Sequence, residues 1–348
     1  MFPASETAPY TLVLSTGCVW EGFEVGRCVL RNVLFNTRLS IDGMDRETDS
    51  VSPDRMSHPQ VSVVVPTYNR ATILVHCLGF LEAQTLDVDS YEVIVVDDGS
   101  VDNTAAVCKA FVQTTSTRLI YLRGPHKGPA AARNLGIAEA RGEIIAFIDD
   151  DCEASKDWLQ QLSAPFNDSD VMGVEGKVVR HPDCTPFTHF VENLHGGLFL
   201  TANVAYRREA LEAVGGFNEN YRHAAAEDWD LAFRILDRGG VIRFCPEASM
   251  VHAPVPVKGR HFVERVRDRR SAALLYQRFP RQWQATTGRT MNRSFAEGIF
   301  MGPFVEARKW TEYFSAHRSE LPRFLWWQAL ASARLLVEYV RLRQDGLA

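Results

Sequence analysis

The chain has 348 residues, a length that fits one large domain with additions or two domains, and its 46% hydrophobic and 23% charged residues are typical of a globular protein. A net charge of −5 excludes general nucleic-acid binding by the chain as a whole. The seven cysteines are scattered and form no CxxC pair, which argues against a disulfide framework or a zinc site and favours reduced thiols in a cytosol.

The N-terminal 58 residues carry no motif that indicates chemistry. Short apolar runs occur within residues 1–40, and the polar segment 41–60 has the composition of a linker. The first residues lack the basic and apolar regions of a signal peptide, and no run of about 18 uncharged apolar residues predicts a transmembrane helix. We therefore expect a cytoplasmic protein in which residues 1–58 are an extension and linker.

From residue 61 onward, apolar runs alternate with helical patterns. Strands are predicted at residues 61–65, 91–96, 119–122 and 143–148, and helices at residues 71–83, 104–112 and 129–140. Near-continuous apolar runs are typical of strands that are buried on both faces of a parallel sheet. The alternation predicts an α/β domain over residues 59–255, with an open, mostly parallel sheet flanked by helices.

Polar residues follow these strands, at the edge where open α/β sheets bind their ligands. The segment PTYN (residues 66–69) follows the first strand, and DDGS (residues 97–100) follows the second. The Asp98 carboxylate is placed to accept the N3–H of a pyrimidine. Taken alone, however, an Asp-Gly pair is as readily interpreted as a common turn.

The fourth strand is followed by the triplet Asp149-Asp150-Asp151. Three adjacent carboxylates repel one another, so we expect a cation beside them. In an extended chain alternate side chains point the same way, which would bring Asp149 and Asp151 together. Such a pair suits Mg²⁺ or Mn²⁺ that already carries phosphate oxygens. A solvated acidic turn is the alternative.

The helix predicted from residue 129 begins after Gly128 and is rich in small residues. Small residues allow a ligand to approach closely, and Lys127 and Arg133 are expected to neutralise a diphosphate. Ordinary packing of an alanine-rich helix is the alternative.

The segment EDWDL (residues 227–231) is predicted to begin a helix that ends at Gly239-Gly240. Asp228 would then lie in the first turn, where the helix dipole favours an ionised carboxylate that can act as a general base. Acidic residues at a helix start are also common without any catalytic role. His252 follows a short apolar stretch, and such an isolated histidine is a metal-ligand candidate only if a metal is already present.

Together these segments resemble the family 2 glycosyltransferases, which have the GT-A fold. The resemblance covers roughly residues 60–255 in family order. Its segments are VSVVVPTYNR, VIVVDDGSVDNT, GPAAARNLGIAEARGEIIAFIDDDC, TANVAYRREALEAVGGF, AAAEDWDLAFRI and PEASMVH. The residues before and after this region carry no family signal.

The resemblance implies a role for each matching position. The donor site would be formed by Pro66, Thr67, Tyr68, Asn69, Asp98, Lys127, Arg133 and Asp150, with Asp98 pairing with the base. The metal ligands would be Asp149, Asp151 and His252. The catalytic base would be Asp228, and the acceptor side would include Gly196, Gly197, Asn203, Glu227 and Trp229.

The implied function is inverting, metal-dependent transfer of a sugar from a nucleotide sugar, a UDP-sugar above all, to a hydroxyl acceptor. A cell-envelope glycan, a glycolipid or a natural product fits the acceptor. The QxxRW motif of processive synthases is absent, which favours transfer of one or a few sugars. The alternatives are a nucleotidyltransferase acting on sugar phosphates, which would need a glycine-rich loop after its first strand, and a non-catalytic nucleotide-sugar-binding protein.

Residues 256–348 are predicted to form a helical extension. Residues 258–281 hold eight basic and two acidic side chains, and an apolar stripe follows helical spacing at Trp326, Leu330, Ala333, Val337 and Val340. Two interpretations remain open: the stripe packs on the catalytic domain, or these features bring the protein to the cytoplasmic face of a membrane.

Overall fold

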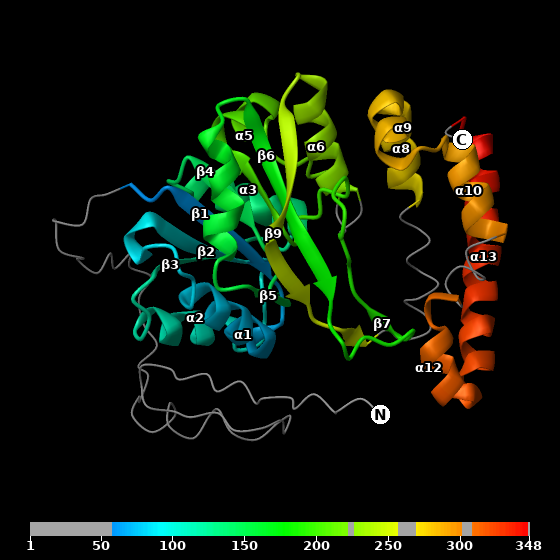
Figure 1. Ribbon diagram of the computed structural model, residues 1–348, viewed down its shortest axis with the longest axis horizontal. Coiled ribbons are helices and arrows are strands. Elements are labelled where there is room, and N and C mark those ends of the chain that lie inside the picture. The colour runs from blue at the N-terminus through cyan, green and yellow to red at the C-terminus, as the bar shows by residue number, and fades with distance from the viewer. Residues whose placement is uncertain (1–57, 222–225, 257–268, 301–307, 347–348) are drawn as a thin grey trace, which may run out of the picture. The chain divides into compact units, whose positions relative to one another are not determined.

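The computed structural model describes residues 58–221, 226–256, 269–300 and 308–346 (Figure 1). The predicted N-terminal extension lies outside the described residues almost entirely, as does most of the basic stretch, residues 258–268. Residues 54–348 belong to one unit.

The first half of the domain alternates strands and helices as predicted. Its elements are β1 (Val61–Thr67), α1 (Ala71–Glu82), β2 (Tyr91–Asp97), α2 (Thr104–Val112), β3 (Arg118–Arg123), α3 (Pro129–Glu139) and β4 (Ile144–Phe147). Each predicted strand and helix of this region is confirmed, with ends that differ by at most two residues. Periodicity was sufficient here because β1, β2 and β4 are almost wholly buried, whereas β3, at the sheet edge, is half-buried.

The second half adds antiparallel strands. Its elements are β5 (Cys152–Ala154), α4 (Trp158–Ser163), β6 (Val171–Arg180), β7 (Thr188–His189), β8 (Val204–Arg207), α5 (Arg208–Val214), α6 (Glu227–Asp237), β9 (Val241–His252) and β10 (Val255–Pro256). Short 3₁₀ turns lie at Val88–Ser90, Ala164–Asn167 and Arg318–Glu320.

Eight strands form one sheet in the order β3-β2-β1-β4-β8-β6-β9-β5, and β7 pairs with β10 separately. The pairs β1–β2, β2–β3, β1–β4 and β6–β9 are parallel, whereas β4–β8, β6–β8 and β5–β9 are antiparallel. The predicted open, mostly parallel sheet flanked by helices is therefore confirmed.

Helices cover both faces of the sheet (Figure 1). Val63 and Val65 of β1 pack with α1, α2 and α4, whereas Val64 packs with α3, α5 and α6. A Cβ added at Gly136 of α3 would lie 2.4 Å from Val64 Cγ1, so α3 rests directly on β1. The small residues of α3 thus serve packing, and the expectation that they leave room for a ligand is wrong for this face of the helix.

The C-terminal region is helical as predicted. Its helices are α8 (Arg269–Arg278), α9 (Pro280–Thr287), α10 (Met291–Phe300), α12 (Thr311–Ala316) and α13 (Leu321–Gln344), coloured from orange to red in Figure 1. Within the described ranges, no helix combines the length and the apolar character that crossing a membrane requires.

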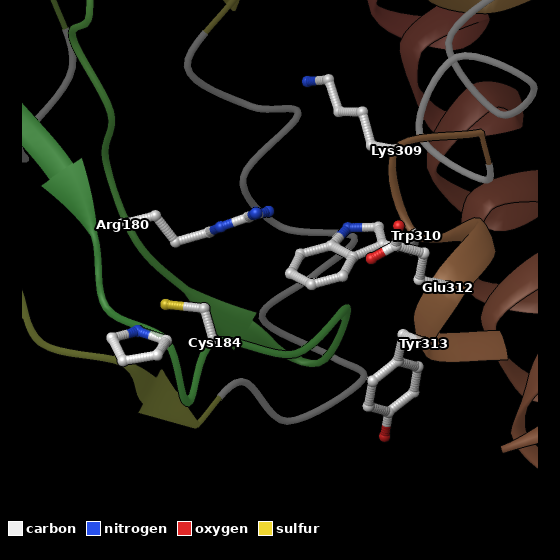
Figure 2. A pocket seen from close by; sticks show the side chains of 7 residues that line it. Arg180, Cys184, Lys309, Trp310, Glu312 and Tyr313 are labelled. Atoms are coloured by element: carbon white, nitrogen blue, oxygen red, sulfur yellow. The ribbon is translucent and has the colours of Figure 1, made fainter. Parts of the chain in front are cut away.

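Two aromatic clusters attach these helices to the domain. Trp283 of α9 packs against Trp229 of α6, with ring centroids 5.4 Å apart. Near the end of β6, the guanidinium of Arg180 lies 4.9 Å from the ring centroid of Trp310, and these two residues line a pocket of about 320 Å³ with Cys184 and Tyr313, among others (Figure 2). The C-terminal helices therefore pack on the α/β domain through residues outside the predicted stripe.

The predicted stripe itself faces solvent. Trp326 is 64% exposed and Val337 is 45% exposed, whereas Phe324, Leu335 and Leu342 form the buried face of α13. The interpretation that the stripe packs this helix on the catalytic domain is therefore wrong. The helical period identified an apolar face correctly but could not reveal that the core is contacted by the opposite one.

Candidate active site

The parallel strands β1, β2 and β4 end at one edge of the sheet, and the polar segments after them meet there. Thr67 pairs in register with Asp97, and Val64 pairs with Phe147 near the end of β4. The predicted donor residues that follow β1, β2 and β4 are thus brought to a common edge.

An aromatic wall forms part of this edge. The rings of Tyr68 and His126 stack with centroids 4.4 Å apart, and both side chains are exposed. Asn69 has a left-handed backbone with φ of 54°, and its side-chain oxygen accepts a hydrogen bond from Val101 N at 2.8 Å. Asn69 therefore stabilises the loop that contains Val101. The rings of Tyr68 and His126 remain exposed and available to stack with a ligand.

Asp98 is committed to the protein backbone. Its Oδ1 accepts a hydrogen bond from Lys127 N at 2.9 Å, and its Oδ2 accepts one from Gly128 N at 2.8 Å. With only 7% exposure, the carboxylate fixes the loop before α3. Asp98 was predicted to accept a hydrogen bond from a base. In the structure, each of its carboxylate oxygens already accepts a hydrogen bond from the backbone.

The Asp149–Asp151 triplet is a turn, in which Cys152 N donates to Asp149 O at 3.2 Å. The extended geometry expected for these residues is therefore wrong: Asp150 and Asp151 share Arg70 Nη1, whereas Asp149 pairs with Arg133. Asp150 accepts hydrogen bonds from Thr67 Oγ1 at 2.6 Å and from Arg70 Nη1 at 2.8 Å. The cation beside the triplet is thus supplied in part by the chain itself, through Arg70.

Asp151 and His252 form the part of the triplet region that fits a metal. The Nε2 atom of His252 lies 3.5 Å from Asp151 Oδ1, and that oxygen is buried without a hydrogen-bond partner among the described residues. His252 Nδ1 lies 2.9 Å from Ala253 O, so a proton on Nδ1 leaves the Nε2 lone pair facing Asp151. An oxygen and a nitrogen with free lone pairs are a donor set that Mn²⁺ or Mg²⁺ accepts.

Cys152 is the third member of this group of potential ligands, since the three ligand atoms lie within 4.8 Å of one another. Burial raises the pKa of the Cys152 thiol well above its usual value, and Mg²⁺ and Mn²⁺ prefer oxygen ligands to a soft sulfur. We therefore regard Asp151 and His252 as the candidate ligands of this group.

A buried arginine joins the triplet to α6. Arg133 Nη2 lies 2.9 Å from Asp149 Oδ1, and Arg133 Nη1 lies 3.1 Å from Glu227 Oε1. Arg133 is 3% exposed, so its charge is compensated inside the protein. Arg133 was predicted to neutralise a diphosphate; in the structure its side chain holds Asp149 and the start of α6 in one arrangement.

Asp228 lies next to this bridge, in the first turn of α6. Burial, followed by the charge of Glu227, raises the pKa of Asp228 to about 8. The expectation that the helix dipole keeps this carboxylate ionised is therefore wrong, because burial outweighs the dipole. A carboxylate with such a pKa is a stronger proton acceptor than an ordinary aspartate, which suits general base catalysis.

The predicted acceptor loop is held by a carboxylate inside β6. Glu175 accepts hydrogen bonds from the backbone N–H groups of Gly197, Leu198 and Phe199. Gly196 and Gly197 have φ of 78° and 82°, a conformation that glycine adopts without strain. These interactions fix the loop between β7 and β8 close to the end of the sheet.

The side chain of Asn203 is buried and is not accessible to a ligand at this loop. It is 1% exposed, accepts a hydrogen bond from Trp158 Nε1 at 2.8 Å, and donates to Lys177 O and Ala248 O. Its predicted place on the acceptor side is therefore wrong, because the amide connects α4, β6 and β9. Trp229 packs against Phe233 and Trp283 and thus belongs to the contact with the C-terminal helices.

Three residues of the site were not predicted from the sequence. They are Arg70, His126 and Glu175. Arg70 is the last letter of the VSVVVPTYNR segment, but its carboxylate partners lie 80 and 81 residues away, so no local pattern indicated the pairing. His126 and Glu175 carried no signal either, because a loop histidine and a glutamate inside a strand indicate nothing about their partners.

Comparison with known proteins gives this arrangement a context. The profile of the family described as Glycosyl transferase family 2 matches residues 62–226. Glycosyltransferase AglE of Haloferax volcanii is 29% identical over 209 residues, which are 57% of this chain and 68% of that protein. The pre-mycofactocin glycosyltransferase of Mycobacterium tuberculosis is 32% identical over 224 residues, and the match spans 58% of this chain but only 44% of that protein.

Solved structures show the same architecture. The mannosyltransferase PcManGT of Pyrobaculum calidifontis, in complex with GDP-Man and Mn²⁺, superposes with a TM-score of 0.58 and 22% identity over 85% of this chain and 90% of that one. S. aureus TarS 1-349 in complex with UDP gives a TM-score of 0.50 and 19% identity over 81% and 91% of the two chains. These likenesses confirm the GT-A fold.

Proposed function

We propose that the chain is a family 2 glycosyltransferase, to whose model residues 62–226 are similar, and that it is a metal-dependent, inverting enzyme. It transfers a sugar from a nucleoside-diphosphate sugar, a UDP-sugar above all, to a hydroxyl acceptor. The acceptor belongs to a cell-envelope glycan, a glycolipid or a natural product.

One observation carries this proposal. Arg133 links Asp149, in the triplet after β4, to Glu227 at the start of α6, and Asp228 follows Glu227 directly. A single buried guanidinium therefore sets the distance between the carboxylates that face the donor and the carboxylate that acts on the acceptor. Such fixed geometry is what a displacement between two bound substrates requires.

The donor lies along the ends of β1, β2 and β4 in this proposal. Its base would stack at the exposed Tyr68 and His126 rings, and the side chains of Asp151 and His252 would hold a divalent metal. When bound, the metal neutralises the charge that develops on the departing nucleotide. Lys127, exposed before α3, adds a positive charge on the same side.

The acceptor hydroxyl attacks the anomeric carbon from the face opposite the nucleotide. The new bond forms from the acceptor oxygen, the bond to the diphosphate oxygen breaks, and Asp228 takes the hydroxyl proton. General base catalysis of this kind contributes about 10²–10⁴-fold to the rate. The loop that contains Gly196 and Gly197 borders the acceptor side, where Glu175 holds its backbone.

The two alternatives are less well supported. A nucleotidyltransferase acting on sugar phosphates needs a glycine-rich phosphate loop after its first strand, and β1 is followed by Thr67-Tyr68-Asn69. Asp228 lies beside Glu227, and the two carboxylates repel each other. A non-catalytic nucleotide-sugar-binding protein would have no use for this unfavourable arrangement.

The decisive experiment is a donor screen with Mn²⁺. The protein is incubated with UDP-, GDP- and dTDP-sugars, with and without mixed acceptors, and nucleotide release and product mass are measured. We expect release from one donor class, stimulated by an acceptor, with inversion at the anomeric carbon seen by NMR. Release of pyrophosphate from a nucleoside triphosphate and a sugar phosphate would support the nucleotidyltransferase instead, and binding without turnover would support the non-catalytic protein.

A further inference from the structure

Six of the fourteen large apolar side chains that are exposed among the described residues lie on α13. Large apolar side chains gather on this helix, and we call them the α13 face: Leu325, Trp326, Leu330, Leu336, Val337 and Val340, exposed by 39% to 64%. The spacing of Trp326, Leu330, Val337 and Val340 places these four on one side of an α-helix. Scattered exposed apolar residues are ordinary, but a continuous row of them marks an interaction site.

The α13 face cannot turn inward, because the other side of the helix is fixed along its length. Phe324, near the start, packs against Phe187 and Phe314 with ring centroids 6.2 Å and 5.0 Å away. Leu335 and Leu342 belong to the cluster that contains Phe233 and Trp283, among others. Rolling the helix to bury Trp326 would expose side chains that are now at most 5% exposed.

The charges on α13 have one sign wherever they reach solvent. The helix carries Arg323, Arg334, Arg341 and Arg343, and its sole acidic residue, Glu338, is 9% exposed on the buried side. At about 100° per residue, the first three arginines border one edge of the α13 face and Arg343 borders the other. Among the described residues, no carboxylate forms an ion pair with Arg334 or Arg343.

These charges decide what the α13 face can bind. A second copy of the chain would set one row of arginines against another, and like charges in contact oppose association. An anionic lipid surface matches the apolar row, the flanking arginines and an exposed tryptophan at once, because tryptophan favours the membrane interface and arginine favours anionic headgroups. We propose that the α13 face docks the protein on an anionic lipid bilayer, with α13 lying in the plane of the surface.

The test is flotation of the full chain with lipid vesicles in a density gradient. We expect the protein to float with vesicles of phosphatidylcholine that contain phosphatidylserine, to float much less with pure phosphatidylcholine, and to be released by high salt. A wild-type protein that stays at the bottom of the gradient with anionic vesicles at low salt would overturn the proposal.

Two multiple variants separate the contributions of the apolar side chains and of the arginines to vesicle binding. Trp326→Glu with Val337→Glu adds charge at positions that already face water, so folding is kept, and binding to anionic vesicles should fall at least about tenfold. Arg334→Gln with Arg341→Gln and Arg343→Gln should lower binding to anionic vesicles by about a hundredfold and leave the weak binding to pure phosphatidylcholine unchanged.

The matched control is Val112→Glu with Val241→Glu, which adds the same charge at apolar residues that are 42% and 40% exposed on other elements. The control should float like the wild type, and equal loss in control and α13 variants would overturn the proposal. So would a wild-type dimer in analytical ultracentrifugation that the α13 variant makes monomeric, because the face would then bind a second copy.

Docking stands apart from the chemistry proposed above. Nucleotide release from a water-soluble donor, measured on the same samples, should be equal in the wild type and the α13 variants. Release without flotation overturns docking alone, whereas flotation without release from any donor overturns the proposed function alone.

Discussion

Two groups of carboxylates at the candidate site differ in how their oxygens are used. Asp97, Asp98 and Asp150 each have both oxygens engaged by donors of the chain. Asp151 has one oxygen bonded to Arg70 and a buried one without a partner among the described residues. Asp228 accepts a hydrogen bond from Trp229 N and has a raised pKa.

This difference distinguishes carboxylates that stabilise the loops from carboxylates that are available to bind a cation or a proton. A carboxylate whose lone pairs are filled by backbone amides or an arginine fixes the loops around it and lowers its own reactivity. A carboxylate that is buried but under-satisfied is destabilising by itself, and a cation or a proton relieves that cost. We therefore expect substitutions in the first group to act on stability, and substitutions of Asp151 and Asp228 to act on function.

The largest effect should come from Asp228→Asn. The amide keeps the shape of the side chain but cannot take a proton, so kcat for transfer should fall by about 10²–10⁴-fold while the donor Kd stays within a few-fold. Steady-state kinetics and calorimetry measure the two quantities. Asp237→Asn, at the other end of α6, is the control and should be fully active. Turnover by Asp228→Asn at the wild-type rate would remove Asp228 from the reactive group.

Arg133→Met should produce the next largest effect, on stability. It leaves Asp149 and Glu227 without their shared buried partner, which costs about 3–5 kcal/mol. Urea unfolding followed by circular dichroism measures this loss, and Arg141→Met, at an exposed arginine after α3, should change the free energy of unfolding little. If Arg133→Met and Arg141→Met were equally stable, the ion pairs of Arg133 with Asp149 and Glu227 would not stabilise the site.

Metal binding should distinguish Asp151 from its neighbour Asp150. EDTA should abolish transfer, and Mn²⁺ or Mg²⁺ should restore it. Asp151→Ala and His252→Ala should weaken Mn²⁺ binding at least about tenfold, as measured by electron paramagnetic resonance. Asp150→Ala, whose carboxylate is engaged by Thr67 and Arg70, should weaken it less. If Asp150→Ala weakened Mn²⁺ binding more than Asp151→Ala, Asp150 would be the metal ligand instead.

Asp98→Asn should have a smaller effect, on stability rather than chemistry. The amide group places a donor against the backbone N–H of Lys127 or Gly128, which costs about 1–3 kcal/mol. Thermal unfolding should show the loss, and the folded variant should keep most of its kcat. An Asp98→Asn protein as stable as the wild type but unable to bind donor would instead show that Asp98 recognises the base.

The smallest effect concerns pH. The folded state raises the pKa of Asp228 from 3.8 to about 8, so the ionised group lowers stability progressively as pH rises from about 4 to about 8. Asp228→Asn lacks this cost. Its Tm should therefore match the wild type near pH 4 and exceed it by a few degrees near pH 8. A Tm difference that does not change with pH would contradict the raised pKa.

Sequence patterns predicted the scaffold well because burial imposes a period. The runs at 61–65 and 91–96 could only be inner strands, and a strand end tells where a ligand edge lies. The same reasoning failed for Asp149–Asp151, since the chain turns there and alternation no longer holds.

Long side chains were the other source of error. Arg133 and Arg70 reach across the site to carboxylates 94 and 81 residues away in sequence at most, and no local pattern encodes such a pairing. Asn203 failed for the same reason, because its three partners lie on other elements. On α13 the period gave the apolar face, but which face meets the core depends on Phe187 and Trp283 elsewhere in the chain.

The place of β9 in the sheet has a consequence for how the protein is made. β9 is the last of the eight strands to leave the ribosome, yet it lies inside the sheet, between β6 and β5. Until residue 252 has emerged, β6 presents an open edge and β5 has no neighbour in the sheet, which is the condition that invites mispairing between chains. His252, the final residue of β9, is also a candidate metal ligand. The strand that closes the sheet therefore carries the residue that would complete the proposed metal site, so we expect full metal binding only after the sheet is closed.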